Sequence, residues 1–244
     1  MAGGTGSWLL AIESATERAS VALLREGEPL ALRALTAARP ASETLLPALL
    51  GLLAEHALAP AALDGIAVSI GPGSFTGLRV GAATAKGLAY GAPSGVAAVP
   101  TLAALAAKGA ALAPAPLVVA AIDARRGELY AAAHRGDDPL APPLWGPAVL
   151  GIEALAERIA AEREGLLVVG EGVDAVAGAL GDRGMGGVRW LAAPEGAPDA
   201  AWVGRLGARL LAAGGGLAAA DLAPIYVRRA EAEVRRTGAR FEPA

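Results

Sequence analysis

One order of apolar segments occurs twice along the chain, and this repeat constrains the fold more than any single motif. Three strand-like runs, a helix, a strand and a second helix follow one another first at residues 8–13, 18–24, 29–35, 42–56, 65–70 and 75–90. The same order returns at residues 117–123, 128–134, 148–150, 152–163, 166–170 and 173–180. Short apolar runs mixed with helical patterns are typical of α/β sheets. We therefore expect two lobes, each a mixed sheet with flanking helices.

This double plan is similar to that of the actin-like and sugar-kinase-like (ASKHA) ATPases, although a fold does not fix a function. We expect the first lobe to span residues 1–110 and the second to span residues 111–244. A strong helix pattern at residues 200–213 lies late in the chain. We expect that helix to pack back on the first lobe.

Composition limits the chemistry that the chain can perform. Apolar residues make up 54% of the chain and aromatic residues 4%, so the core must be built from Ala, Leu and Val. A net charge of −3 argues against general electrostatic attraction to nucleic acid. The absence of cysteine excludes disulfides, thiolate catalysis and cysteine-ligated zinc. Neither an export signal nor a membrane span is evident, so we expect a cytoplasmic protein.

Two consecutive helices of the first lobe carry more packing surface than one sheet needs. Ser42 is the predicted N-cap of the first helix, whose leucines cover more than one narrow stripe. The second helix repeats small residues every four positions, at Gly77, Gly81 and Ala85. Glycine inside a helix costs about 1 kcal/mol, so this spacing indicates close packing. Either the leucines all face inward, or part of this surface binds a partner.

The turn before the second helix could be a phosphate-binding loop or a tight structural corner. Residues 71–81 read GPGSFTGLRVG, where a strand ends in a glycine turn and a helix begins. Free amides at a helix start attract anions. However, a phosphate loop needs two glycines at fixed spacing followed at once by lysine. Gly73 and Gly77 are too close, so the residues favour a tight strand-to-helix corner.

The same stretch closely resembles the signature of the TsaB family. Three further segments resemble that family in the right order: residues 10–23, residues 121–130 and the Pro-x-Tyr-x-Arg run at residues 224–228. The resemblance implies an actin-like two-lobed fold and a role in making threonylcarbamoyladenosine beside the anticodon of tRNA. It implies a non-catalytic subunit that scaffolds and activates a homologous catalytic subunit, TsaD, which holds the metal and performs the transfer.

The resemblance also implies the partners. TsaD binds the first lobe, a TsaE-like ATPase joins the pair, and the chain alone forms homodimers through the same surface. Contact with tRNA is indirect or weak, and no membrane, cofactor, metal or catalytic residue of its own is expected. The candidate partner surface comprises Leu45, Leu46, Leu49, Leu50, Leu53, Gly77, Val80, Gly81, Thr84, Ala85 and Leu88. Candidate vestigial nucleotide-site residues are Glu13, Gly71, Gly73, Ser74 and Asp123.

Two enzyme hypotheses stand beside the subunit hypothesis. The acids Glu13 and Asp123 could support a nucleotide-binding phosphotransferase of the actin-like fold, although Glu13 stands where the family usually has Asp. A peptidase is weaker, because no nucleophile or metal constellation is evident. The two histidines, His56 and His134, lie in different lobes, which argues against a metal pair. The arginine-rich residues 226–240 could touch tRNA phosphates or form a solvated terminus, and the latter is favoured.

Overall fold

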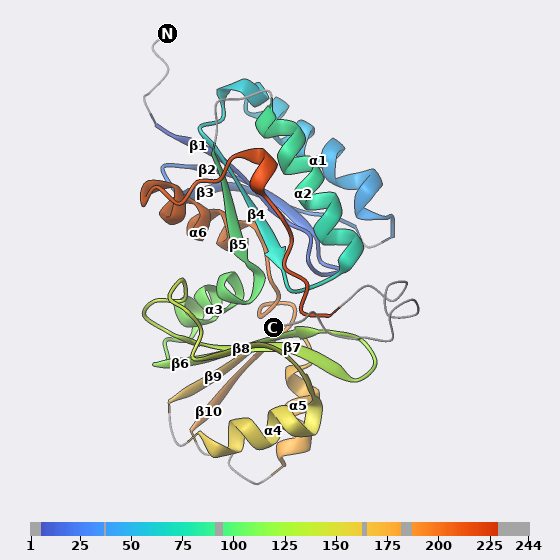
Figure 1. The fold of residues 1–244 in the computed structure, drawn as a ribbon, viewed down its shortest axis with the longest axis vertical. Helices are drawn as coiled ribbons and strands as arrows, with labels where there is room; N and C mark the ends of the chain where they lie inside the picture. The colour runs from blue at the N-terminus through green and yellow to red at the C-terminus, as the bar shows by residue number, and fades with distance from the viewer. Residues whose placement is uncertain (1–5, 37, 91–94, 163–164, 182–186, 229–244) are drawn as a thin grey trace. The chain divides into compact units, whose positions relative to one another are not determined.

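The computed structural model describes residues 6–36, 38–90, 95–162, 165–181 and 187–228 (Figure 1). The chain divides into two compact units. Unit 1 contains the residues up to Pro100 together with Asp199–Pro224, and unit 2 contains Thr101–Pro198 together with the residues from Ile225. Within the described residues each unit holds a five-stranded mixed sheet, so the predicted two-lobed α/β fold is confirmed.

The two sheets have the same topology. Unit 1 has the order β3-β2-β1-β4-β5, and unit 2 has the matching order β8-β7-β6-β9-β10. In each, the first three strands are antiparallel neighbours and the last two run parallel to the first. The strands are β1 (Trp8–Glu13), β2 (Ser20–Arg25), β3 (Glu28–Ala34), β4 (Gly65–Gly71), β5 (Gly95–Pro100), β6 (Leu117–Asp123), β7 (Glu128–Arg135), β8 (Trp145–Gly151), β9 (Leu166–Gly170) and β10 (Val188–Ala192).

Helices cover both faces of each sheet. In unit 1, α1 and α2 pack on one face and α6 on the other; in unit 2, α4 and α5 pack on one face and α3 on the other (Figure 1). No helix among the described residues is long and apolar enough to cross a bilayer. The helices are α1 (Ala41–Glu55), α2 (Phe75–Tyr90), α3 (Thr101–Leu112), α4 (Ile152–Ala161), α5 (Val173–Leu180) and α6 (Ala200–Ala212).

Strand alternation explains the two-sided burial in unit 1. Leu10 and Ile12 of β1 join the apolar cluster beneath α1 and α2, while Ala11 faces α6. An ideal Cβ added at Gly204 of α6 would lie 3.1 Å from the Ala11 Cβ. Successive side chains of a strand point to opposite faces, so a strand buried on both faces must be apolar throughout. The apolar run at residues 8–12, which forms all of β1 except Glu13, is the sequence signature of that burial.

The division between the units differs from a boundary after residue 110. Helix α3 belongs to unit 2, because Leu102 and Leu105 pack in one apolar cluster with Val118 and Ala120 of β6. Helix α6 follows the last strand of unit 2 but packs on β1, β2, β4 and β5 of unit 1. Each unit therefore receives one covering helix from the chain segment that follows the other unit's last strand.

The turn before β3 and the start of α1 both depend on local backbone preferences. Glu26 and Gly27 both have positive φ, as a two-residue type I′ turn requires, and they join β2 to β3 in a hairpin. The predicted N-cap at Ser42 is wrong. Helix α1 begins at Ala41, and Pro40 precedes it without a side-chain cap. Proline has no N–H to satisfy and is tolerated just before the first turn.

Candidate functional site

The leucines of α1 divide into a buried set and an exposed set. Leu45, Leu49 and Leu53 are at most 1% exposed and fill the core of unit 1. Leu46 is 45% exposed and Leu50 is 44% exposed. The four-residue spacing of the exposed pair places both side chains on one outward stripe of the helix. The leucine pattern is thus explained by two faces, of which the inner one serves the chain's own core.

The small residues Gly77, Gly81 and Ala85 face inward. An ideal Cβ at Gly77 would lie well inside 3.0 Å of the Ser14 carbonyl oxygen, and one at Gly81 would collide with Ser14 Oγ. Ser14 Oγ in turn donates a hydrogen bond of 2.9 Å to the Gly77 carbonyl oxygen. This stripe therefore lets α2 approach the turn after β1, and its residues are not available to a partner.

A second stripe of small residues lies on the outer side of α2. Ala83 and Gly87 are exposed, and a Cβ added at Gly87 would meet no atom within 4 Å. Half-buried Val80, Thr84 and Leu88 flank them. Sequence reasoning missed Ala83 and Gly87. Their four-residue spacing was a visible signal, but nothing in the sequence showed which of two small stripes pointed outward.

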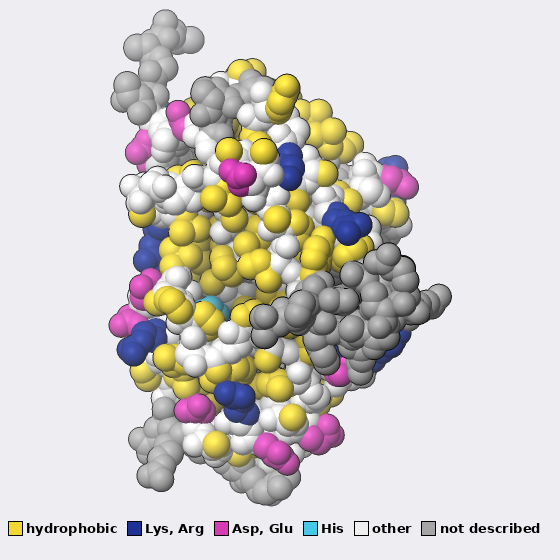
Figure 2. Space-filling view, viewed as in Figure 1, with side chains coloured by type: hydrophobic (Ala, Val, Ile, Leu, Met, Phe, Trp, Pro, Cys, Tyr) yellow, Lys and Arg dark blue, Asp and Glu magenta, His cyan; other side chains and the backbone are white. Residues whose placement is uncertain are grey.

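The predicted partner residues thus divide into a buried group and an accessible group. Leu45, Leu49, Leu53, Gly77, Gly81 and Ala85 are buried in unit 1, and a buried side chain cannot contribute directly to a partner contact. The accessible residues, with the newly placed ones, form what we call the α1–α2 face: Leu46, Pro47, Leu50, Val80, Ala83, Thr84, Gly87 and Leu88. Figure 2 shows hydrophobic side chains in the region of unit 1 that α1 and α2 occupy in Figure 1.

The candidate nucleotide-site residues of unit 1 pack against one another. The Ser74 amide donates a 2.7 Å hydrogen bond to the Ala15 carbonyl oxygen. The Ala15 amide donates a 2.6 Å hydrogen bond to Glu13 Oε1. A Cβ at Gly73 would collide with Ala15, while Gly71 ends β4. The turn after β1 therefore packs directly against the glycine loop. This geometry favours the tight-corner hypothesis for residues 71–81.

Asp123 lies in unit 2, at the end of β6, and repeats the role of Glu13. Its Oδ1 accepts a 2.7 Å hydrogen bond from the Arg125 amide two residues on. Both acids thus stabilise the turn that follows the first strand of their own sheet. Glu128, the first residue of β7, forms an ion pair with Arg228, whose guanidinium also donates a 2.8 Å hydrogen bond to the Ala124 carbonyl oxygen.

The two histidines lie in different units. His56 follows the end of α1 in unit 1, and His134 lies in β7 of unit 2. Within the part of the chain that the structure describes, no three His, Asp or Glu side chains are grouped as metal ligands. Residues 229–240 of the predicted arginine-rich tail lie outside the described residues.

The buried His134 predicts a stability that depends on pH. The side chain is 4% exposed, and burial lowers the pKa of His134, an effect that the Pro139 backbone partly offsets. The unfolded chain therefore takes up a proton near pH 6.5 that the folded chain resists. We expect the free energy of unfolding to fall as the pH drops below about 6.5. Urea titrations of His134→Gln should lack this component, whereas His56→Gln should retain it; equal slopes in all three proteins would contradict the assignment.

Comparisons with known proteins agree with this geometry. The family model described as "TsaD: tRNA N6-adenosine threonylcarbamoyltransferase" matches residues 35–162, more than half of the chain. The chain is 45% identical over 122 residues to the tRNA threonylcarbamoyladenosine biosynthesis protein TsaB of Haemophilus influenzae, a match that covers 50% of this chain and 51% of that protein. It is 38% identical over 130 residues to the protein of the same name from Escherichia coli, covering 53% and 56%.

A solved structure extends the likeness over nearly the whole chain. YeaZ from Pseudomonas aeruginosa matches with a TM-score of 0.76 at 32% identity, covering 90% of this chain and 99% of that one. The sequence matches to the curated relatives span about half of their length, whereas this structural match runs across both units. The fold, the family model and these relatives lead to one conclusion: the chain belongs to the TsaB (YeaZ-like) family.

Proposed function

We propose that the chain is a non-catalytic subunit of the complex that forms threonylcarbamoyladenosine beside the tRNA anticodon. Its α1–α2 face binds and activates a TsaD-like catalytic subunit, a TsaE-like ATPase joins the pair, and two copies of the chain pair through the same face when alone. The printed names of the relatives, tRNA threonylcarbamoyladenosine biosynthesis protein TsaB, support the pathway. The features of the α1–α2 face support the proposed binding of a protein partner.

The α1–α2 face has the features of a helix-packing surface. Leu46 and Leu50 lie one turn apart on α1, and each exposes nearly half of its surface. This exposed apolar surface does not stabilise the chain on its own, because it is not buried when the chain folds. Ala83 and Gly87 leave the α2 backbone accessible to a close neighbour. Large side chains beside small ones let two helices interlock ridge into groove. An exposed apolar surface of this kind favours a protein partner over a small ligand.

The acids that could have supported a phosphotransferase have a structural role in each unit. Glu13 is fully buried and Asp123 accepts from a turn amide, so each stabilises the local fold. Ser14 and Ala15 pack against the glycine loop of unit 1. These contacts support a subunit that keeps the fold of an ATPase family and uses its outer helices for binding.

Reconstitution with the catalytic subunit tests the proposal. Leu46→Asp places a charge on the α1–α2 face, and we expect at least about tenfold weaker binding of the TsaD-like subunit and a matching loss of threonylcarbamoyladenosine formation. Leu32→Asp is the control, because Leu32 of β3 is also exposed, at 51%. Its neighbour Ala31 points to the α1 side of the sheet, so Leu32 points to the opposite side, away from the α1–α2 face. Equal binding by both variants and the unsubstituted chain, measured by calorimetry, would refute the proposed face.

A further inference from the structure

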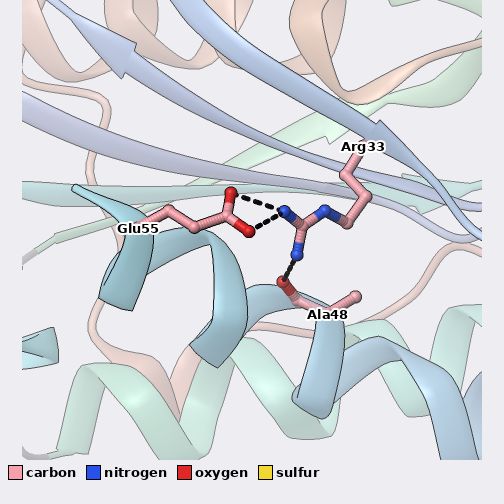
Figure 3. Close-up of polar contacts among 3 residues, drawn as sticks. All are labelled: Arg33, Ala48 and Glu55. Atoms are coloured by element: carbon pink, nitrogen blue, oxygen red, sulfur yellow. Dashed lines mark hydrogen bonds and ion pairs between the residues drawn. The ribbon is translucent and has the colours of Figure 1, made fainter.

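One side chain of the edge strand reaches across to α1. The Arg33 guanidinium donates from Nη2 to both carboxylate oxygens of Glu55, each at 2.6 Å, and from Nη1 to the Ala48 carbonyl oxygen at 3.3 Å (Figure 3). Arg33 thus contacts two successive turns of the helix from the side of the sheet. We call these three residues the Arg33 clamp.

The helix has a gap that fits this guanidinium. Gly51 lies between the two contacted turns, and an ideal Cβ there would lie 3.1 Å from Arg33 Nη1. A contact that short is tighter than ordinary van der Waals packing, so a side chain at residue 51 would press on the guanidinium. Glycine costs about 1 kcal/mol in a helix interior. Its presence beside Arg33 indicates that access of the guanidinium to the helix backbone offsets that cost.

The Arg33 clamp acts on the part of α1 that carries Leu50. Ala48 and Gly51 flank Leu50 along the chain, and Glu55 is the last residue of the helix. The helix start has no side-chain cap, and Pro47 removes one backbone donor within the helix. The Arg33 side chain is 34% exposed and that of Glu55 is 58% exposed, and such a pair adds little to global stability. We therefore expect the Arg33–Glu55 ion pair to affect the local geometry of α1 more than the global stability of the chain.

We propose that Arg33 and Glu55 are positioning residues that hold the Leu50 turn of α1 in the geometry a partner helix requires. This inference rests on the proposed function, since it concerns the same face. The guanidinium itself need not touch the partner. It sets the height and rotation of the helix above the edge strand β3, and a partner that packs on Leu46 and Leu50 binds the helix in that position.

Binding and hydrogen exchange together test the Arg33 clamp. We expect Arg33→Met and Glu55→Gln each to weaken binding of the TsaD-like subunit roughly three- to fivefold. Amide exchange in residues 48–55 should quicken, while the urea midpoint changes little. Arg33→Lys keeps the charge but loses the two-armed contact, so partial recovery is expected. The control is Arg39→Met, which removes the exposed Arg39–Glu43 pair at the start of the same helix and should leave both readouts unchanged.

The outcomes separate this inference from the proposed function. If Arg33→Met and Glu55→Gln bind like the unsubstituted chain while Leu46→Asp does not, the Arg33 clamp has no positioning role and the proposed function stands. If Leu46→Asp also binds normally, the proposed function fails. Should Arg33→Met not fold, Glu55→Gln and Gly51→Ala decide the question, because both retain Arg33; normal binding and normal exchange in both would overturn the inference.

Discussion

Leu50→Glu is expected to leave the chain folded and to abolish its pairing with the TsaD-like subunit, whereas Leu49→Glu is expected to prevent folding. The two leucines are neighbours in α1, but Leu50 is 44% exposed and Leu49 is fully buried. An unpaired carboxylate in an apolar core carries a large desolvation cost. At residue 50 that cost arises only when a partner excludes water. We expect a loss of affinity of about a hundredfold or more for Leu50→Glu.

Circular dichroism and sedimentation distinguish the two outcomes. Leu50→Glu should keep the helical signal and the urea midpoint of the unsubstituted chain, and it should also lose self-association. Leu49→Glu should lose the cooperative transition. Leu50→Ala serves as the volume control, because it removes apolar contact without adding charge and should weaken binding less. If Leu50→Glu unfolded like Leu49→Glu, the outward direction of Leu50 would be wrong.

Gly77→Ala is expected to destabilise unit 1 by about 3 kcal/mol, the upper end of the usual range for a substitution that overpacks a rigid site. The new methyl group would collide with the backbone oxygen of Ser14, which is held between the end of β1 and α2. Backbone cannot move aside as a flexible side chain can, so α2 would have to shift away from the sheet. Gly87→Ala in the same helix meets open space and should stabilise the chain by about 0.5–1 kcal/mol.

Urea unfolding of the two glycine variants provides the comparison. Because both changes add one methyl group to α2, any general effect of helix propensity cancels between them. A difference in the free energy of unfolding below about 1 kcal/mol would contradict the close approach of α2 to Ser14. Gly87→Trp extends the test to binding. It adds bulk to the α1–α2 face without touching the core, and we expect it to weaken the partner contact without lowering the urea midpoint.

Patterns that act over short stretches of chain were predictable from the sequence. The apolar runs at residues 117–122 and 166–170 fall within β6 and β9, because strand positions buried on both faces of a sheet need apolar residues. The glycine hairpin at Glu26-Gly27 and the helix at Phe75–Tyr90 were also set locally, by backbone preference and by the lack of proline. The four segments of TsaB resemblance then gave the family, since they lie in order along most of the chain.

The tertiary structure alone decided which surfaces stay exposed. Periodicity shows that α1 has leucines on two faces and α2 has two stripes of small residues, but it cannot show which face meets the sheet. Packing against Ser14 settled that Gly77 and Gly81 face inward, leaving Ala83 and Gly87 outside. The placement of α3 in unit 2 and the contact of Arg33 with Glu55 were equally hidden. Each depends on residues distant in sequence, and their meeting is determined by the packing of the whole unit.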